Sequence, residues 1–175
     1  MGWDGTFRHP SRIVIAAPPL MSLRLAAGPT LMKPTLEETP LLGRDMKGEV
    51  TWTGAGGYVG TTGGGKSFNI YDKDSPSPTE MLIHAHAACS LIDVVGGLKE
   101  RVDNVEFATI EIEVEMAEDY PKVITSIQMK YIIKGDVPEV LVRRLIEGSH
   151  EKFCRVGIMI TRSGASLDWE LEMLS

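Results

Sequence analysis

The sequence SPTEMLIHAHAACSLIDVVGGLKE, residues 77–100, decides the fold. Its first four residues form a capping box, in which Ser77 and Glu80 satisfy backbone N–H groups at a helix start and Pro78 takes the first helical position. The residues that follow are apolar around most of the helix circumference, which is typical of a central, buried helix. We therefore predict one long helix that extends to about Glu100.

Strand patterns lie on both sides of this helix. Residues 49–53 and 67–71 favour two short strands, and the glycine-rich residues 54–65 between them predict the tight turns of a hairpin or small meander. After the helix, apolar residues alternate with polar ones over three longer stretches, 110–116, 127–134 and 167–173. We expect the lysines of the second stretch to face the glutamates of the first across a strand pair.

Two further helices are predicted between the last two strands. Residues 136–139 form a second N-terminal cap that leads a helix closed by Gly148, and Ser149 caps another helix that carries Cys154 in its second turn. The element order β-β-α-β-β-α-α-β predicts an α+β domain with a mostly antiparallel sheet and a buried central helix.

Length and composition restrict the class of protein. A chain of 175 residues with 43% hydrophobic and 24% charged residues suits one globular domain. No apolar run approaches the ~18 residues of a membrane span, and the net charge of −6 argues against nucleic acid. We expect a cytoplasmic protein with neither membrane nor nucleic acid as partner. Residues 1–45 lack any amphipathic period, so we predict a disordered extension, dispensable for folding, before a domain over residues 46–175.

One phosphate-binding motif matches by chance. Residues 60–67, GTTGGGKS, fit the pattern of the P-loop, whose amides cradle phosphates at the start of a helix. The residues after Ser67 include Pro76 and Pro78 and cannot form that helix. We therefore exclude nucleotide binding.

Two cysteines can form one redox pair, but they cannot make a disulfide scaffold or a four-thiolate metal site. Cys89 lies in the middle of the apolar helix, where a cysteine is most often a small core residue. His86 and Asp93 share its helix face at positions i−3 and i+4. The three residues suit a Cys–His–Asp relay, part of a metal site, or simple packing.

Cys154 has a different local sequence. It lies near a helix N-terminus and beside Arg155 and Lys152. Both features favour a thiolate. We therefore expect Cys154 to ionise readily.

These motifs resemble those of a known family. Residues 77–82 (SPTEML) and 85–95 (AHAACSLIDVV) are similar to the central helix of the OsmC/Ohr family, and residues 151–154 (EKFC) are similar to the helix of its second cysteine. The separation of the cysteines, 154 − 89 = 65 positions, also fits. The resemblance covers roughly residues 46–173 and is closest to the YhfA-like branch.

The resemblance implies an intertwined homodimer with active sites at the subunit interface. It also implies a thiol-dependent peroxidase that reduces hydroperoxides, preferably organic ones, in oxidative-stress defence, with no metal or organic cofactor. By position, Cys89 is the peroxidatic cysteine, which becomes a sulfenic acid. Cys154 is then the resolving cysteine, and an external dithiol reduces the disulfide that the two form.

The sequence departs from the pattern of the family's active hydroperoxide reductases at two points. Those proteins carry an Arg on the early hairpin, whereas residues 46–76 contain none. They also carry a Glu ten residues before the reactive cysteine, where this chain has Thr79 followed by Glu80. We take Glu80 and His86 as candidate supporting residues. Further candidates for the missing cation are Lys66, Arg44 and Arg155.

The alternative function is therefore that of a family member without peroxidase activity. Such a protein would keep the fold and the cysteine pair but act in binding or in sulfur handling. Whether a hydroperoxide links Cys89 to Cys154 distinguishes the two functions.

Overall fold

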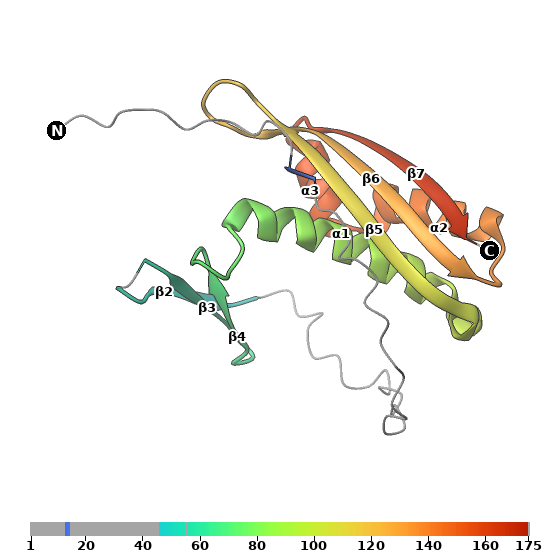
Figure 1. Cartoon of the computed structure of the whole chain (residues 1–175), viewed down its shortest axis with the longest axis horizontal. Helices are drawn as coiled ribbons and strands as arrows, with labels where there is room; N and C mark the ends of the chain where they lie inside the picture. The colour runs from blue at the N-terminus through green and yellow to red at the C-terminus, as the bar shows by residue number, and fades with distance from the viewer. Residues whose placement is uncertain (1–12, 15–45, 55, 175) are drawn as a thin grey trace. The chain divides into compact units, whose positions relative to one another are not determined.

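The computed structural model describes residues 13–14, 46–54 and 56–174 (Figure 1). The described residues form two compact units, one over residues 46–79 and one over residues 80–174 together with 13–14. Of the predicted extension 1–45, only Ile13–Val14 is described, as the short strand β1. The rest of that prediction lies outside the described residues.

The first unit is a three-stranded antiparallel meander. Its strands are β2 (Gly48–Trp52), β3 (Tyr58–Thr62) and β4 (Ser67–Ile70), in the order β2-β3-β4. The two predicted strands are present, but the prediction of turns over 54–65 was wrong for β3. Gly60 belongs to this strand because the ring of Phe68 on β4 covers it, at 2.6 Å from where a Cβ would lie.

The chance P-loop match spans two strands of this meander. Residues 60–62 end β3, and Ser67 begins β4. A strand, and not a helix, therefore follows Lys66. The structure has no helix N-terminus at this motif to meet a phosphate, as the sequence predicted.

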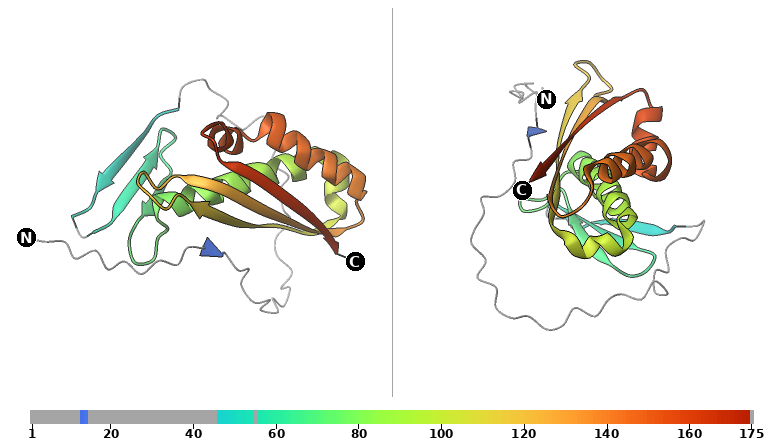
Figure 2. Two further views of the ribbon diagram at one scale, coloured as in Figure 1. Left: turned by 90° about the horizontal axis from the view of Figure 1, so that it is seen from above. Right: turned by 90° about the vertical axis from the view of Figure 1, so that its right-hand side faces the viewer.

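The second unit packs three helices on one face of a four-stranded sheet (Figures 1 and 2). The sheet order is β1-β5-β6-β7. β5 (Val105–Met116) is antiparallel to β1 and to β6 (Ile124–Gly135), whereas β7 (Ser166–Leu174) runs parallel to β6. The predicted α+β class with a mostly antiparallel sheet is confirmed.

The alternating patterns correctly predicted which sheet face is buried. Four side chains of β6 point into the core and are at most 1% exposed: Ile127, Met129, Tyr131 and Ile133. On the other face, Lys130 lies opposite Glu111 of β5 in the strand register, but its Nζ contacts Glu172 of β7 at 2.7 Å. Lys134 does reach β5, where it contacts Glu106 at 3.1 Å. These ion pairs are exposed and contribute little stability.

The predicted long helix is α1 (Pro78–Gly97), which begins at the expected residue and ends three residues before Glu100. A 3-10 helix, η2 (Lys99–Asn104), follows it. Within one chain α1 buries a single stripe, formed by Ile83, His86, Ser90 and Val94. On its other side Ile92 is 70% exposed, so the helix is not buried all round. No helix among the described residues is long and apolar enough to span a membrane.

The region around Cys154 differs from the prediction. Pro138, and not Asp136, is the N-cap of α2 (Glu139–Gly148). Gly148 has ordinary helical backbone angles, and the chain continues into a π-helical turn, η3 (Ser149–Phe153), before α3 (Arg155–Arg162). Cys154 is therefore the N-cap of α3 and does not lie in a second turn. Ser149 is not the N-cap of a helix: it is the C-cap of α2, and its hydroxyl bonds to Ser90 and Asp93 in the core.

Candidate functional site

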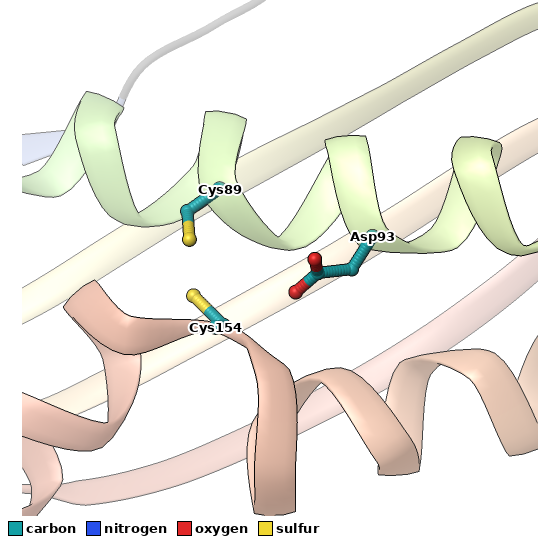
Figure 3. Close-up of side chains that lie close together, drawn as sticks. All are labelled: Cys89, Asp93 and Cys154. Atoms are coloured by element: carbon teal, nitrogen blue, oxygen red, sulfur yellow. The ribbon is translucent and has the colours of Figure 1, made fainter. Parts of the chain in front are cut away.

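Two cysteines and one carboxylate come together between α1 and the start of α3 (Figure 3). Cys89 and Asp93 project from α1 toward Cys154, and one ligand atom of each residue lies within 4.8 Å of the other two. Both thiols are free. Cys89 is half-buried, whereas Cys154 is fully buried. We refer to Cys89, Asp93 and Cys154 as the thiol cluster.

Cys154 reaches α1 because Gly157, one turn into α3, has no side chain. A Cβ at this position would lie 2.4 Å from Nε2 of His86 on α1. The N–H of Gly157 donates to Sγ of Cys154 at 3.4 Å, which makes the thiol the cap of its own helix. The thiol donates in turn to the backbone oxygen of His86 at 3.8 Å. These contacts hold Cys154 against the turn of α1 that precedes Cys89.

Asp93 is held by a chain of hydrogen bonds through the core. Ser149 Oγ donates to Asp93 Oδ2 at 2.8 Å, and the hydroxyls of Ser149 and Ser90 are 2.9 Å apart. Ser90 also bonds to the hydroxyl of Tyr131, which lies 3.0 Å from Nε2 of His150. Each hydroxyl has one proton to donate, and Ser149 donates its proton to the carboxylate of Asp93. Ser90 must therefore donate to Ser149, Tyr131 to Ser90, and His150 to Tyr131. His150 is therefore protonated at Nε2, and the chain ends on Asp93.

The thiol of Cys154 is kept neutral by its surroundings. Burial raises its pKa, the N–H of Gly157 acts in the opposite direction, and the nearby Cys89 and Asp93 raise the pKa further. The sequence-based expectation that Cys154 ionises readily is therefore wrong. Arg155 and Lys152 do not reverse this effect, because both are exposed while the sulfur is in the core.

The other predicted residues lie outside the thiol cluster. His86 is fully buried, neither of its ring nitrogens has a hydrogen-bond partner, and its ring meets that of His150 edge-on at 6.0 Å between centroids. Cys154, rather than the His86 ring, completes the group with Cys89 and Asp93. Glu80 lies in the first turn of α1 and is not a member either. For the candidate cations, Arg155 is exposed, Lys66 belongs to the other unit, and Arg44 lies outside the described residues.

Sequence reasoning missed four residues of the hydrogen-bond chain: Ser90, Tyr131, Ser149 and His150. One signal was available, because Tyr131 occupies an inward position of an alternating strand and a buried phenol needs a partner. Gly157 offered a second signal, since a glycine inside a helix usually marks a close packing contact.

The donor types of the thiol cluster also occur in zinc sites, which use thiolates and carboxylates. Among the described residues the group has three members, one short of a closed tetrahedral site. The expectation from sequence that no metal or organic cofactor is needed stays a prediction.

Comparisons with known proteins identify the family and the fold. The model of the OsmC-like protein family matches residues 71–170. Protein YhfA of Escherichia coli (strain K12) is 31% identical over 123 residues, which cover 67% of this chain and 91% of YhfA. A hypothetical protein from Aquifex aeolicus VF5 has a TM-score of 0.66 at 25% identity, over 76% of this chain and 100% of its own. The organic hydroperoxide resistance protein OsmC from Legionella pneumophila shares the fold, with a TM-score of 0.52 at 15% identity over 75% and 97% of the two chains.

Gly157→Ala should separate the two cysteines. The new methyl group would overlap the ring of His86, and overpacking of this kind costs roughly 1–3 kcal/mol. We expect weaker urea resistance and slower loss of free thiols on treatment with diamide. Gly96→Ala is the matched control, because a Cβ at Gly96 on α1 meets nothing within 4 Å and alanine favours the helix by up to ~1 kcal/mol. Equal stability and equal oxidation in both variants would contradict the proposed close approach.

The free energy of unfolding should fall as the pH is lowered from about 7 to about 5. Burial lowers the pKa of His86, and burial together with the charge of His86 lowers that of His150 to about 4. An unfolded histidine has a pKa of ~6.5, so the unfolded chain binds protons in this range that the folded chain does not. Urea titrations at several pH values measure the loss. His86→Leu should reduce it, whereas His84→Leu, at an exposed position of the same helix, should not. An unchanged pH dependence in His86→Leu would refute this.

Proposed function

Since the chain belongs to the OsmC-like protein family, we propose that it is a thiol-dependent peroxidase that reduces organic hydroperoxides in oxidative-stress defence. The observation that carries the proposal is that two free cysteines lie close together, Cys89 on α1 and Cys154 at the start of α3. A protein described as an organic hydroperoxide resistance protein shares the fold and motivates the choice of substrate.

Cys89 is the residue that attacks the peroxide. Its side chain is partly exposed, whereas Cys154 has no exposed surface and cannot be reached by a hydroperoxide. The sulfur of Cys89 displaces an alcohol from the O–O bond, so that one thiol and one hydroperoxide give one sulfenic acid and one alcohol. The raised pKa of Cys154 supports this assignment, because a neutral thiol is a poor nucleophile.

Cys154 then resolves the sulfenic acid. Its thiol condenses with Cys89 to a disulfide and releases water, and an external dithiol restores both thiols. The cycle uses the two thiols, the hydroperoxide and the reductant. We place it in the cytoplasm, where thiol reductants are abundant.

A homodimer is part of the proposal. Helix α1 is the longest helix among the described residues and is half-covered within one chain, with the side chains of Ile92 and Leu82 exposed on the other side. An apolar helix face of this kind is best covered by a second copy of the chain, and obligate dimers typically bury more than ~2,000 Å².

One observation supports the alternative function in binding or sulfur handling. Residues 46–76 contain no Arg, and the thiol cluster contains a carboxylate and no cation. One equivalent of cumene hydroperoxide, followed by mass spectrometry without reduction, separates the two functions. A loss of two hydrogens mapped to Cys89 and Cys154 supports the peroxidase, whereas unchanged thiols support the alternative.

The two cysteine variants should behave differently with hydroperoxide. Cys89→Ser should abolish peroxide consumption, because the remaining thiol is buried. Cys154→Ser should complete a single turnover and leave a sulfenic acid on Cys89 that dimedone traps and further peroxide over-oxidises. Peroxide consumption and intact mass measure both effects. Full activity in Cys89→Ser would mean that Cys154 is the attacking residue.

Light scattering should give the mass of a dimer at micromolar concentration. Ile92→Glu should lower that mass, because it places a charge on the exposed face of α1. Val140→Glu on α2 is the matched control, since Val140 is 73% exposed and lies outside α1. A monomeric mass for the unmodified protein would refute the dimer.

A further inference from the structure

We propose that Asp93 accepts the proton of the Cys154 thiol when this residue attacks Cys89. For a hydroperoxide as the oxidant, the inference rests on the proposed function. The need for a proton acceptor is more general, because any disulfide that closes between these cysteines must first remove a proton from Cys154.

The position of Cys154 creates this need. Its thiol is fully buried, and its hydrogen is directed at the backbone oxygen of His86, which accepts a hydrogen bond but does not take up the proton. Burial also raises the pKa of the thiol, so few molecules carry a thiolate at neutral pH. Without a base beside it, the second half of the reaction would be slow.

Asp93 is the carboxylate in the right place. It follows Cys89 by one helical turn, and its oxygen lies within 4.8 Å of both sulfurs (Figure 3). A modest side-chain movement or one water molecule closes such a distance, since catalytic contacts are often longer in the resting state. Ser149 is the residue that donates to Asp93 among the described side chains, and it binds Oδ2, so Oδ1 faces no donor of the hydrogen-bond chain.

The hydrogen-bond chain behind Asp93 explains why this carboxylate is well oriented. Its far end is His150, and each link joins side chains that are buried or half-buried. The titratable side chains near Asp93 are Cys89 on its own helix, Cys154 at the start of α3 and Tyr131 on β6. The ring of His150 contacts Tyr131, and that of His86 contacts His150. His86 is the weaker candidate base, because burial lowers its pKa and its ring lies outside the thiol cluster.

The step balances as follows. The S–H bond of Cys154 breaks, and its proton moves to Asp93, while the Cys154 sulfur forms a bond to the sulfenic sulfur of Cys89. The S–O bond breaks at the same time, and the leaving hydroxide takes the proton from Asp93 and departs as water. The sulfur of Cys154 is oxidised, that of Cys89 is reduced, and Asp93 ends as the carboxylate it was.

The test uses the full chain and an oxidant that is not a peroxide. One equivalent of 5,5′-dithiobis(2-nitrobenzoate) releases one coloured thiolate when it modifies Cys89, and a second when Cys154 displaces the reagent to close the disulfide. Asp93→Asn keeps the size of the side chain and an acceptor for Ser149, but removes the base. We expect the first release to be no slower than in the unmodified protein, and the second to slow about 100-fold, within the range for a lost general base.

Two controls make the result specific. Asp168→Asn is the same chemical change at an exposed position of β7 and should alter neither phase. His84→Leu removes an exposed histidine of the same helix and should also leave the second phase unchanged. A second release in Asp93→Asn within about twofold of the unmodified rate overturns the proposal.

The pH profile separates proton transfer from a structural effect. In Asp93→Asn the second release should rise about tenfold per pH unit between about pH 7 and about pH 9, because it then depends on the thiolate of Cys154. In the unmodified protein it should be flatter. If the variant does not fold, the unmodified profile decides, and a tenfold rise per unit there overturns the proposal.

The same protein then shows which of the two proposals fails. A hydroperoxide that leaves Cys89 unmodified refutes the peroxidase. Dependence of the second release on Asp93 would still support the proton acceptor in that case, because the reagent does not require peroxidase chemistry.

Discussion

The structure of the site depends on the close approach of α3 to α1 at Gly157 and His86. Two helices normally keep a distance set by their side chains, and here one helix contributes only a hydrogen atom at the contact. The N-terminus of α3 therefore lies against α1, and its capping residue faces into the core. That residue is Cys154, which lies between η3 and α3. The close approach of the two helices therefore brings the sulfur of Cys154 to that of Cys89.

Burial makes the two cysteines chemically unequal. The two cations beside Cys154 in the sequence, Arg155 and Lys152, do not cause the difference, because both are exposed. What differs is solvent access, because Cys89 keeps some exposed surface while Cys154 has none. Burial keeps the Cys154 thiol protonated, and in the proposed cycle the exposed thiol of Cys89 meets the oxidant. Packing thus makes Cys89 the first cysteine to react in the proposed cycle and Cys154 the second. Cys154 must then lose its proton within the core.

The sequence predicted what repeats locally and missed what depends on tertiary contacts. The alternation over 127–134 identified the buried face of β6, and the capping box placed the start of α1, because both are properties of adjacent residues. The cysteine pair came from a resemblance of motifs. The strand β3 was missed because Gly60 favours turns until Phe68 covers it. Ser149 looked like a helix cap, and only the fold shows that Ser90 and Asp93 use its hydroxyl.

A carboxylate beside two thiols has the opposite effect from the arginine that active hydroperoxide reductases use. A cation stabilises the thiolate that attacks the peroxide, whereas Asp93 raises the pKa of Cys154 and can only receive a proton. In the proposed cycle, the thiol cluster therefore serves the second half, in which a buried thiol must be deprotonated. Attack on the peroxide has no such help from within the cluster. In the proposed cycle, attack on the peroxide is then the slower step, and the disulfide closes soon after the sulfenic acid forms. Such an order of rates would protect Cys89 from over-oxidation, because the sulfenic acid would not persist.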